Sequence, residues 1–124
     1  MTQSASCRLA LVLLLAVISA PHASAADSKK SSKPTGALAY HRESGSFGYA
    51  VNAKDSQSAR VIALNQCGHP KCEVVASLSK DCGAVANGPK KFAAARGATR
   101  QEAETKALRQ CGERCEIVGW ACPR

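Results

Sequence analysis

One stretch of this chain occurs twice. ALNQCGHPKCEVV extends from Ala63 to Val75, and ALRQCGERCEIV extends from Ala107 to Val118 with one residue fewer between its cysteines. GALAY at residues 36–40 is likewise matched by GAVAN at residues 83–87. Such self-similarity predicts two copies of one supersecondary unit, residues 36–82 and 83–124, which pack together because neither can bury its apolar face alone.

Each copy contains signals for one helix. Thr99 followed by Glu102 is typical of a capping box, in which the two side chains satisfy backbone N–H groups at a helix start. This helix should end near Cys111, before Gly112. The matching helix should begin at Asp55 or Ser56. Small and apolar residues mark the inner faces, namely Ala59, Ile62, Ala63 and Cys67 in the first helix and Ala103, Ala107, Leu108 and Cys111 in the second.

Short β-rich runs surround both helices. CEVVASL and CEIVGW follow the helices, and the runs GALAY, FGYAV, GAVAN and KFAAA precede them. Each copy therefore reads strand, strand, helix, strand. The predicted fold class is α+β, with two helices on a mostly antiparallel sheet of unspecified strand order, and with Phe92 and Trp120 in the core.

The N-terminal residues are typical of a secretory signal peptide. Arg8 precedes the apolar run LALVLLLAVISA, and the small residues Ala23, Ser24 and Ala25 follow Pro21. The run is shorter than the roughly 20 residues that cross a membrane. We expect cleavage after Ala25, with Ala26 and a retained anchor as alternatives, and no transmembrane segment in the mature chain. Residues 26–35 should form a disordered basic leader, and residues 36–124 a single domain.

Cleavage would remove Cys7 and leave six of the seven cysteines. In an exported chain an even number favours a disulfide framework. Zinc is an alternative because His69 lies between Cys67 and Cys72, but the second copy has no matching histidine. A redox site is disfavoured because the negative ends of the helix dipoles oppose thiolates at Cys67 and Cys111. No metal or cofactor is predicted.

Sequence alone leaves many disulfide connectivities open. The repeat favours those pairings that stay the same when the two repeats are interchanged. Among these, Cys67–Cys72 and Cys111–Cys115 would each clip a helix end to the following strand. Cys82–Cys122 would then join the two halves.

These motifs together carry a family resemblance. GALAY, GYAVN, the alanine-rich helix ending in CG, CEVV, DCGAVA and the terminal WAC resemble the secreted bacterial family catalogued as domain of unknown function 4189. The resemblance covers Gly36 to Cys122 and implies export, the doubled α+β unit and the cysteine framework. It implies no catalytic residue. Leu78 and Ser79 depart from the family pattern, in which an aromatic residue is common before DCG.

Catalytic motifs are weak. His41 lies in HRESGS with an acid and a hydroxyl, which invites a hydrolase interpretation, but a Ser- and Gly-rich segment between strands is typical of a hairpin loop. His69 is expected in an exposed turn. No phosphate-binding glycine loop and no obvious pair of catalytic carboxylates is present in the sequence, so no catalytic residue is assigned.

The charge balance favours binding to anions. Loss of Arg8 with the signal peptide would leave 16 of the 17 Lys and Arg residues, compared with nine Asp and Glu residues. The second copy should present a basic face, and its candidate anion-binding residues are Lys90, Lys91, Arg96, Arg100, Lys106, Arg109 and Arg114. A merely solvated helix face is the alternative. With five aromatic residues in the whole chain, specific nucleic-acid binding is not expected.

Three functions follow as hypotheses. The favoured one is a non-enzymatic, disulfide-stabilised interaction module, periplasmic or secreted, that binds a protein or an anionic envelope component. The second is an inhibitor or immunity-like protein that blocks an envelope-directed enzyme, with HRESGS as the inserting loop. The third is a small hydrolase that uses His41 or His69.

Overall fold

The computed structural model describes residues 34–124. The signal peptide expected at residues 1–25 and most of the leader expected at 26–35 lie outside the described residues. The described elements are the strands β1 (Gly36–His41) and β2 (Ser46–Ala50), helix α1 (Ser56–Cys67), strands β3 (Glu73–Leu78), β4 (Cys82–Asn87) and β5 (Phe92–Gly97), helix α2 (Arg100–Cys111), and strand β6 (Glu116–Ala121). The predicted order of strand, strand, helix, strand is confirmed in both repeats.

The strands form two sheets of three, whereas the sequence pattern predicted one sheet. Their orders are β2-β1-β3 and β5-β4-β6, and every pairing is antiparallel. Each repeat therefore completes its own sheet, with its first strand in the centre. The α+β class and the two repeated units are confirmed, and the contact between repeats is made by sheet faces rather than by strand pairing.

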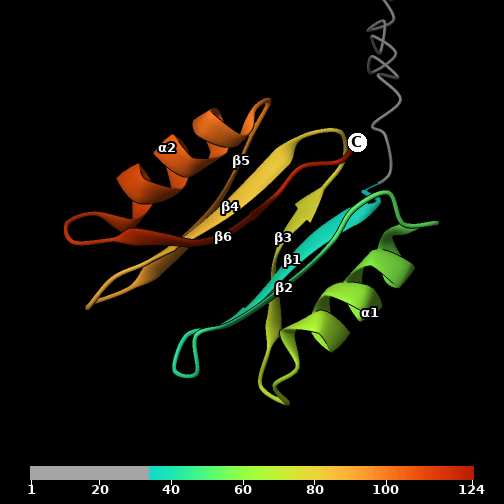
Figure 1. Ribbon diagram of the computed structural model, residues 1–124, viewed down its shortest axis with the longest axis horizontal. Helices are drawn as coiled ribbons and strands as arrows, with labels where there is room; N and C mark the ends of the chain where they lie inside the picture. Colours follow the sequence, from blue (N-terminus) through green and yellow to red (C-terminus); the bar gives the residue numbers. More distant parts are fainter. Residues whose placement is uncertain (1–33) are drawn as a thin grey trace, which may run out of the picture.

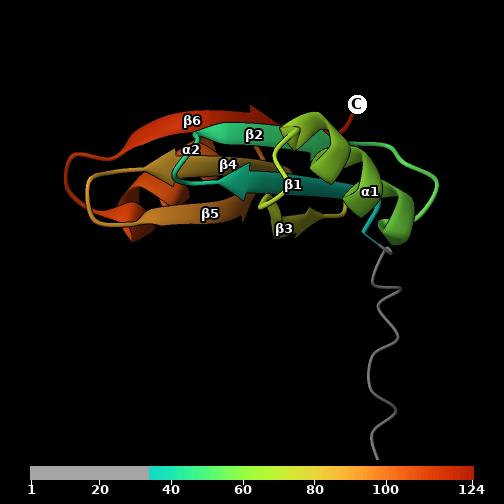
Figure 2. The ribbon, with the colours of Figure 1, turned by 90° about the horizontal axis from the view of Figure 1, so that it is seen from below.

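The molecule has four layers, with α1 and α2 on the outside and the two sheets between them (Figure 1). One core cluster joins α1 to the alanines of its sheet, and a second does the same for α2. A third lies between the sheets and contains Leu38, Tyr40, Leu78 and Val85. Strands β2 and β6 lie on one side of the sandwich, and β3 and β5 lie on the other (Figure 2).

Both helices use small residues to lie close to their sheets. The buried positions are Ala59, Ala63 and Cys67 in α1 and Ala103, Ala107 and Cys111 in α2. Asp55 caps α1 by accepting a hydrogen bond from the Ser58 N–H, and Thr99 caps α2 by accepting one from the Glu102 N–H. Gly68 ends α1 with φ of 71°, a left-handed conformation that glycine adopts without a steric cost.

Three residues expected inside are half exposed. Ile62 is 42% exposed because the face of α1 that is buried against the sheet consists of Ala59, Ala63 and Cys67. Ile62 lies beside this buried face. Phe92 and Trp120 are 38% and 40% exposed because β5 and β6 are edge strands. These two core predictions, and the inward placement of Ile62, were wrong.

The role expected for the Cys82–Cys122 bridge was also wrong. Cys82 is the first residue of β4, and Cys122 directly follows β6. Gly83 pairs with Ala121 in the ladder between these strands, so the bridge extends that ladder by one step. It therefore joins two strands of the second sheet and does not join the two repeats.

Candidate anion-binding site

A basic cleft lies where the β4–β5 turn approaches the loop between α2 and β6. Gly88 closes the turn by donating its N–H to the Lys91 carbonyl over 3.0 Å. A side chain at Gly88 would overlap Sγ of Cys115, so the absence of a side chain lets the turn contact the loop. The Cys111–Cys115 disulfide ties this loop to the last residue of α2. Both walls are therefore held by local covalent or hydrogen-bonded structure.

The cleft has a volume of about 490 Å³. Lys90 and Lys91 line it from the turn, and Arg114 lines it from the loop, together with Glu113 as the acid in the lining. All three cationic side chains are exposed. Within residues 34–124 none of them forms an ion pair shorter than 4.0 Å. Their charges are therefore available to an anionic ligand.

The first repeat adds a fourth cation to this end of the molecule. The Arg42 guanidinium, in the β1–β2 turn, donates a hydrogen bond to the Gly88 carbonyl over 3.2 Å. Arg42 was not among the predicted residues, and its separation of 46 positions from Gly88 leaves no local sequence signal for the contact. Burial raises the pKa of the nearby Tyr40 phenol, and the Arg42 charge partly opposes that increase.

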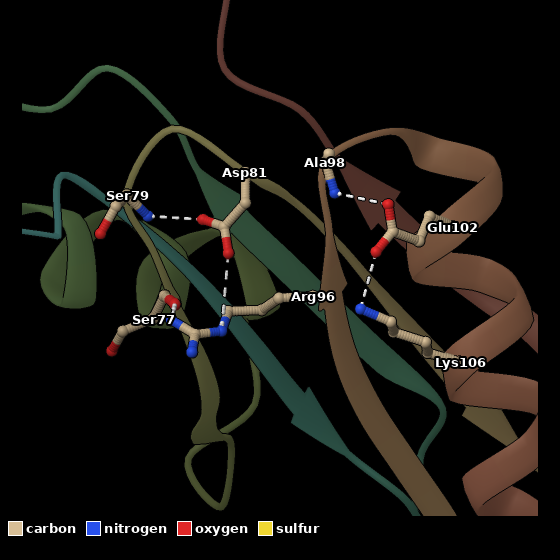
Figure 3. A network of polar contacts seen from close by, with 7 residues as sticks. All are labelled: Ser77, Ser79, Asp81, Arg96, Ala98, Glu102 and Lys106. Atoms are coloured by element: carbon tan, nitrogen blue, oxygen red, sulfur yellow. Dashed lines mark hydrogen bonds and ion pairs between the residues drawn. The ribbon is translucent and has the colours of Figure 1, made fainter.

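The remaining predicted cations are distributed differently. Arg96 lies 3.6 Å from the Asp81 carboxylate and donates to the Ser77 carbonyl, and Lys106 lies 2.7 Å from the Glu102 carboxylate (Figure 3). Arg100 pairs with Glu104 over 2.8 Å. Arg109 lies on the outer surface of α2, beside Glu102 and Lys106. Three of the seven candidates are thus matched by carboxylates, and three of the remaining four line the cleft.

A second groove, of about 1010 Å³, runs along β3 and β5. Its lining includes Asp81 with Arg96 and Glu102 with Lys106. Because these opposite charges pair across 3.6 Å and 2.7 Å, the groove offers less free positive charge than the smaller cleft. The cleft is therefore the stronger candidate for an anion site.

The HRESGS segment forms the β1–β2 turn, as its composition predicted. The Ser44 hydroxyl lies 2.7 Å from Nδ1 of His41, and the Ser44 N–H also donates to that nitrogen. The His41 ring stacks on His69 at 4.0 Å between centroids. In the described part of the chain no carboxylate hydrogen-bonds to His41, so the pair lacks the acid that orients the base in a triad.

All six cysteines of the described chain form disulfides. Cys67–Cys72 and Cys111–Cys115 each connect the end of a helix to the residue before the next strand, and Cys82–Cys122 connects two strand ends. No group of three or more His, Cys, Asp or Glu side chains in residues 34–124 is arranged to hold a metal ion. Within the same residues no helix is long and apolar enough to span a membrane.

These features define a class of protein, a small α+β domain made of two repeats, each with its own sheet, helix and disulfide-clipped loop. Comparison with known sequences then identifies the family. Residues 35–122 match the family described as "Domain of unknown function (DUF4189)", and the chain belongs to it.

Its relatives include uncharacterized proteins from mycobacteria. The chain is 39% identical over 87 residues to Rv1813c of Mycobacterium tuberculosis and to Mb1843c of Mycobacterium bovis. This alignment covers 70% of the chain and 59% of each relative, so the chain matches about three fifths of their length. The NMR structure of Rv1813c superimposes with a TM-score of 0.57 at 37% identity, covering 69% of this chain and 72% of that one.

Proposed function

We propose that this protein is an exported, non-enzymatic interaction module that binds an anionic partner through the basic cleft. The observation that supports it most directly is the group of Lys90, Lys91 and Arg114 around one cavity without carboxylate partners. The disulfides and the apolar N-terminal run support a periplasmic or secreted location, with cleavage after Ala25. The partner is a protein or an anionic component of the envelope.

The cleft can be tested with two polyanions, heparin and lipid A. Replacement of Lys90, Lys91 and Arg114 with Gln should weaken binding of either one at least tenfold, because three exposed charges are lost. A matched variant with Gln at Lys54, Arg60 and Lys80 loses the same charge elsewhere on the surface and should bind nearly as the wild type. Binding should also weaken steeply as salt rises. Equal losses in both variants would indicate general charge attraction and refute a specific cleft.

The HRESGS turn supports a second candidate function, an inhibitor or immunity-like protein. The His41–His69 stack and the hydrogen bond between the Ser44 and Ser46 hydroxyls over 2.8 Å hold this exposed turn in shape. A rigid, projecting turn suits insertion into an enzyme cleft. Capture of a cell-wall hydrolase with loss of that enzyme's activity would support this function. Capture without inhibition would favour the interaction module.

The Ser44–His41 contact keeps a hydrolase as the third candidate. Replacement of both His41 and His69 with Ala should abolish turnover of a small ester if that candidate is correct. Turnover that persists in this double variant would remove it.

A further inference from the structure

The two sheets differ in how their outer edges are protected. Helices α1 and α2 pack mainly over the sheet side that carries β2 and β5, so β3 and β6 form the less covered edges. On β3 the Arg96 guanidinium, from the other sheet, donates to the outward carbonyl of Ser77 over 3.2 Å (Figure 3). On β2 the outward N–H of Tyr49 donates to the Gln66 side chain over 3.2 Å. Side chains thus occupy backbone groups to which another strand would otherwise bind.

The edge of β6 has no such protection. Ser77 and Trp120 occupy equivalent places, since they pair with Ala37 and Ala84 in the two sheets. The backbone N–H and C=O of Trp120 should therefore also point outward. The residue equivalent to Arg96 is Val51, which packs against the core between the sheets and has no side-chain donor. In residues 34–124 no side chain hydrogen-bonds to the backbone of β6.

A groove of about 550 Å³ follows this edge, and its lining combines apolar residues of β6 and Phe47 with the charged residues Arg100 and Glu104. Phe47 forms one wall, with its ring directly over Gly119, where a side chain could not fit. Trp120 and Val118 form the other wall, and each is 40% exposed. The Arg100 guanidinium lies 3.9 Å above the Trp120 ring and is held there by Glu104. Exposed apolar side chains beside the unpaired edge of a strand are features of strand-addition sites.

The same strand leads into the basic cleft. Arg114 and Cys115 line the cleft, and β6 begins at the next residue, Glu116. We propose that β6 binds an extended segment of a partner protein as an added strand. Its apolar side chains would occupy the groove, and its acidic end would reach Lys90, Lys91 and Arg114. Charge complementarity predicts that the end of the partner segment at the cleft is acidic. The partner residue that would lie opposite Glu116 should not be an acid, because two negative charges would repel each other. The proposal rests on the interaction role proposed above and specifies its partner as a polypeptide.

Peptide selection on the disulfide-bonded protein, purified from the periplasm of an expressing bacterium, tests the proposal. A random dodecapeptide library would be selected on the wild type alone, and the enriched peptides would then be measured on Val51→Arg, which reproduces at β6 the protection that Arg96 gives β3. Enriched peptides should combine an acidic end with alternating apolar residues. They should bind Val51→Arg at least tenfold more weakly, and they should shift the amide resonances of Ile117 to Trp120 in the wild type.

Trp120→Ala gives an independent check that does not depend on folding around a new arginine, and it should also weaken binding of the selected peptides about tenfold. Peptides that bind both variants as well as the wild type, or a library that yields none, would overturn the proposal. So would a dimer in sedimentation velocity that Val51→Arg abolishes, because it would assign the edge to a second copy. Heparin binding should persist in Val51→Arg. If the wild type binds the selected peptides but does not bind heparin, only the proposal of an envelope polyanion as partner would be refuted.

Discussion

The two repeats share a fold but differ in how each sheet is closed and which charges it carries. In the second sheet Cys82 and Cys122 bridge the ends of β4 and β6. The equivalent positions of the first sheet are Thr35 and Ser79, which flank the Gly36–Leu78 pair. The loop end of the second repeat is basic, whereas that of the first carries the stacked rings of His41 and His69.

The shared features are those that fold the unit. Each repeat has an N-capped helix with a buried stripe of two alanines and a cysteine, a glycine after the helix, and a register shift between its first and third strands. The differences in sheet closure and charge fall on strand ends, turns and exposed edges, where a change leaves the buried contacts intact. Divergence at these surfaces supports the assignment of binding to the cleft and to β6 rather than to the repeated core.

The largest expected effect comes from the disulfide that only the second sheet has. Replacement of Cys82 and Cys122 with Ala should lower the free energy of unfolding by about 4 kcal/mol, because the bridge closes a loop with a sequence separation of 40. Removal of the Cys67–Cys72 clip should cost about 2 kcal/mol, since its separation is only 5. Urea unfolding without reductant measures both. Equal losses would contradict the loop-entropy account.

A glycine in the first repeat should be nearly as sensitive. A Cβ at Gly48 would overlap backbone atoms of Ala63 and Cys67 in α1, whereas the equivalent residue facing α2 is Ala93. Gly48→Ala should therefore destabilise the protein by about 3 kcal/mol through overpacking. Ala93→Gly, the reciprocal change, should cost only about 1 kcal/mol through added chain entropy. A Gly48→Ala variant as stable as the wild type would mean that α1 can move away from its sheet without loss.

The asymmetry between the sheets can also be removed. Thr35→Cys with Ser79→Cys places two cysteines next to the Gly36–Leu78 pair, in the same relation that Cys82 and Cys122 have to Gly83 and Ala121. The bridge should form and stabilise the protein by about 2 kcal/mol, less than the full entropic gain because new disulfides distort their surroundings. Intact mass after alkylation reports the bridge, and Ser79→Cys alone is the control. A double variant with two free thiols would show that the two sheet ends are not equivalent.

The sequence predicted what local chemistry determines. Repetition indicated the order of elements, and the Thr99–Glu102 pattern located the start of α2, where the Thr99 hydroxyl does accept the Glu102 N–H. The expectation of one sheet failed because strand pairing between repeats depends on long-range packing that no single segment encodes. The same reason applies to the Arg42–Gly88 contact and to the grouping of Lys90 and Lys91 with Arg114. Periodicity likewise could not show that β5 and β6 are edge strands, which is why Phe92 and Trp120 were misplaced.

The smallest expected effect distinguishes the two helix starts by pH. Hydrogen bonds from Ser58 hold the pKa of Asp55 below its ordinary value of 3.8. A hydrogen bond from Lys106, followed by the Ala98 N–H, lowers the pKa of Glu102 from its ordinary value of 4.5. Both carboxylates titrate lower in the folded state, so the stability they contribute is complete above these ordinary values and is lost as pH falls through the folded values.

Urea midpoints measured from pH 7 to pH 3 should therefore begin to fall near pH 4.5, first through Glu102 and then, nearer pH 3.8, through Asp55. Glu102→Gln should flatten the upper part of this decline, and Asp55→Asn should flatten the lower part. Glu43→Gln, which removes an exposed carboxylate outside both helix starts, is the matched control. If neither variant changed the slope, the acid sensitivity would have to come from elsewhere in the chain. If both flattened the same pH range, the two helix starts would be electrostatically equivalent despite their different caps.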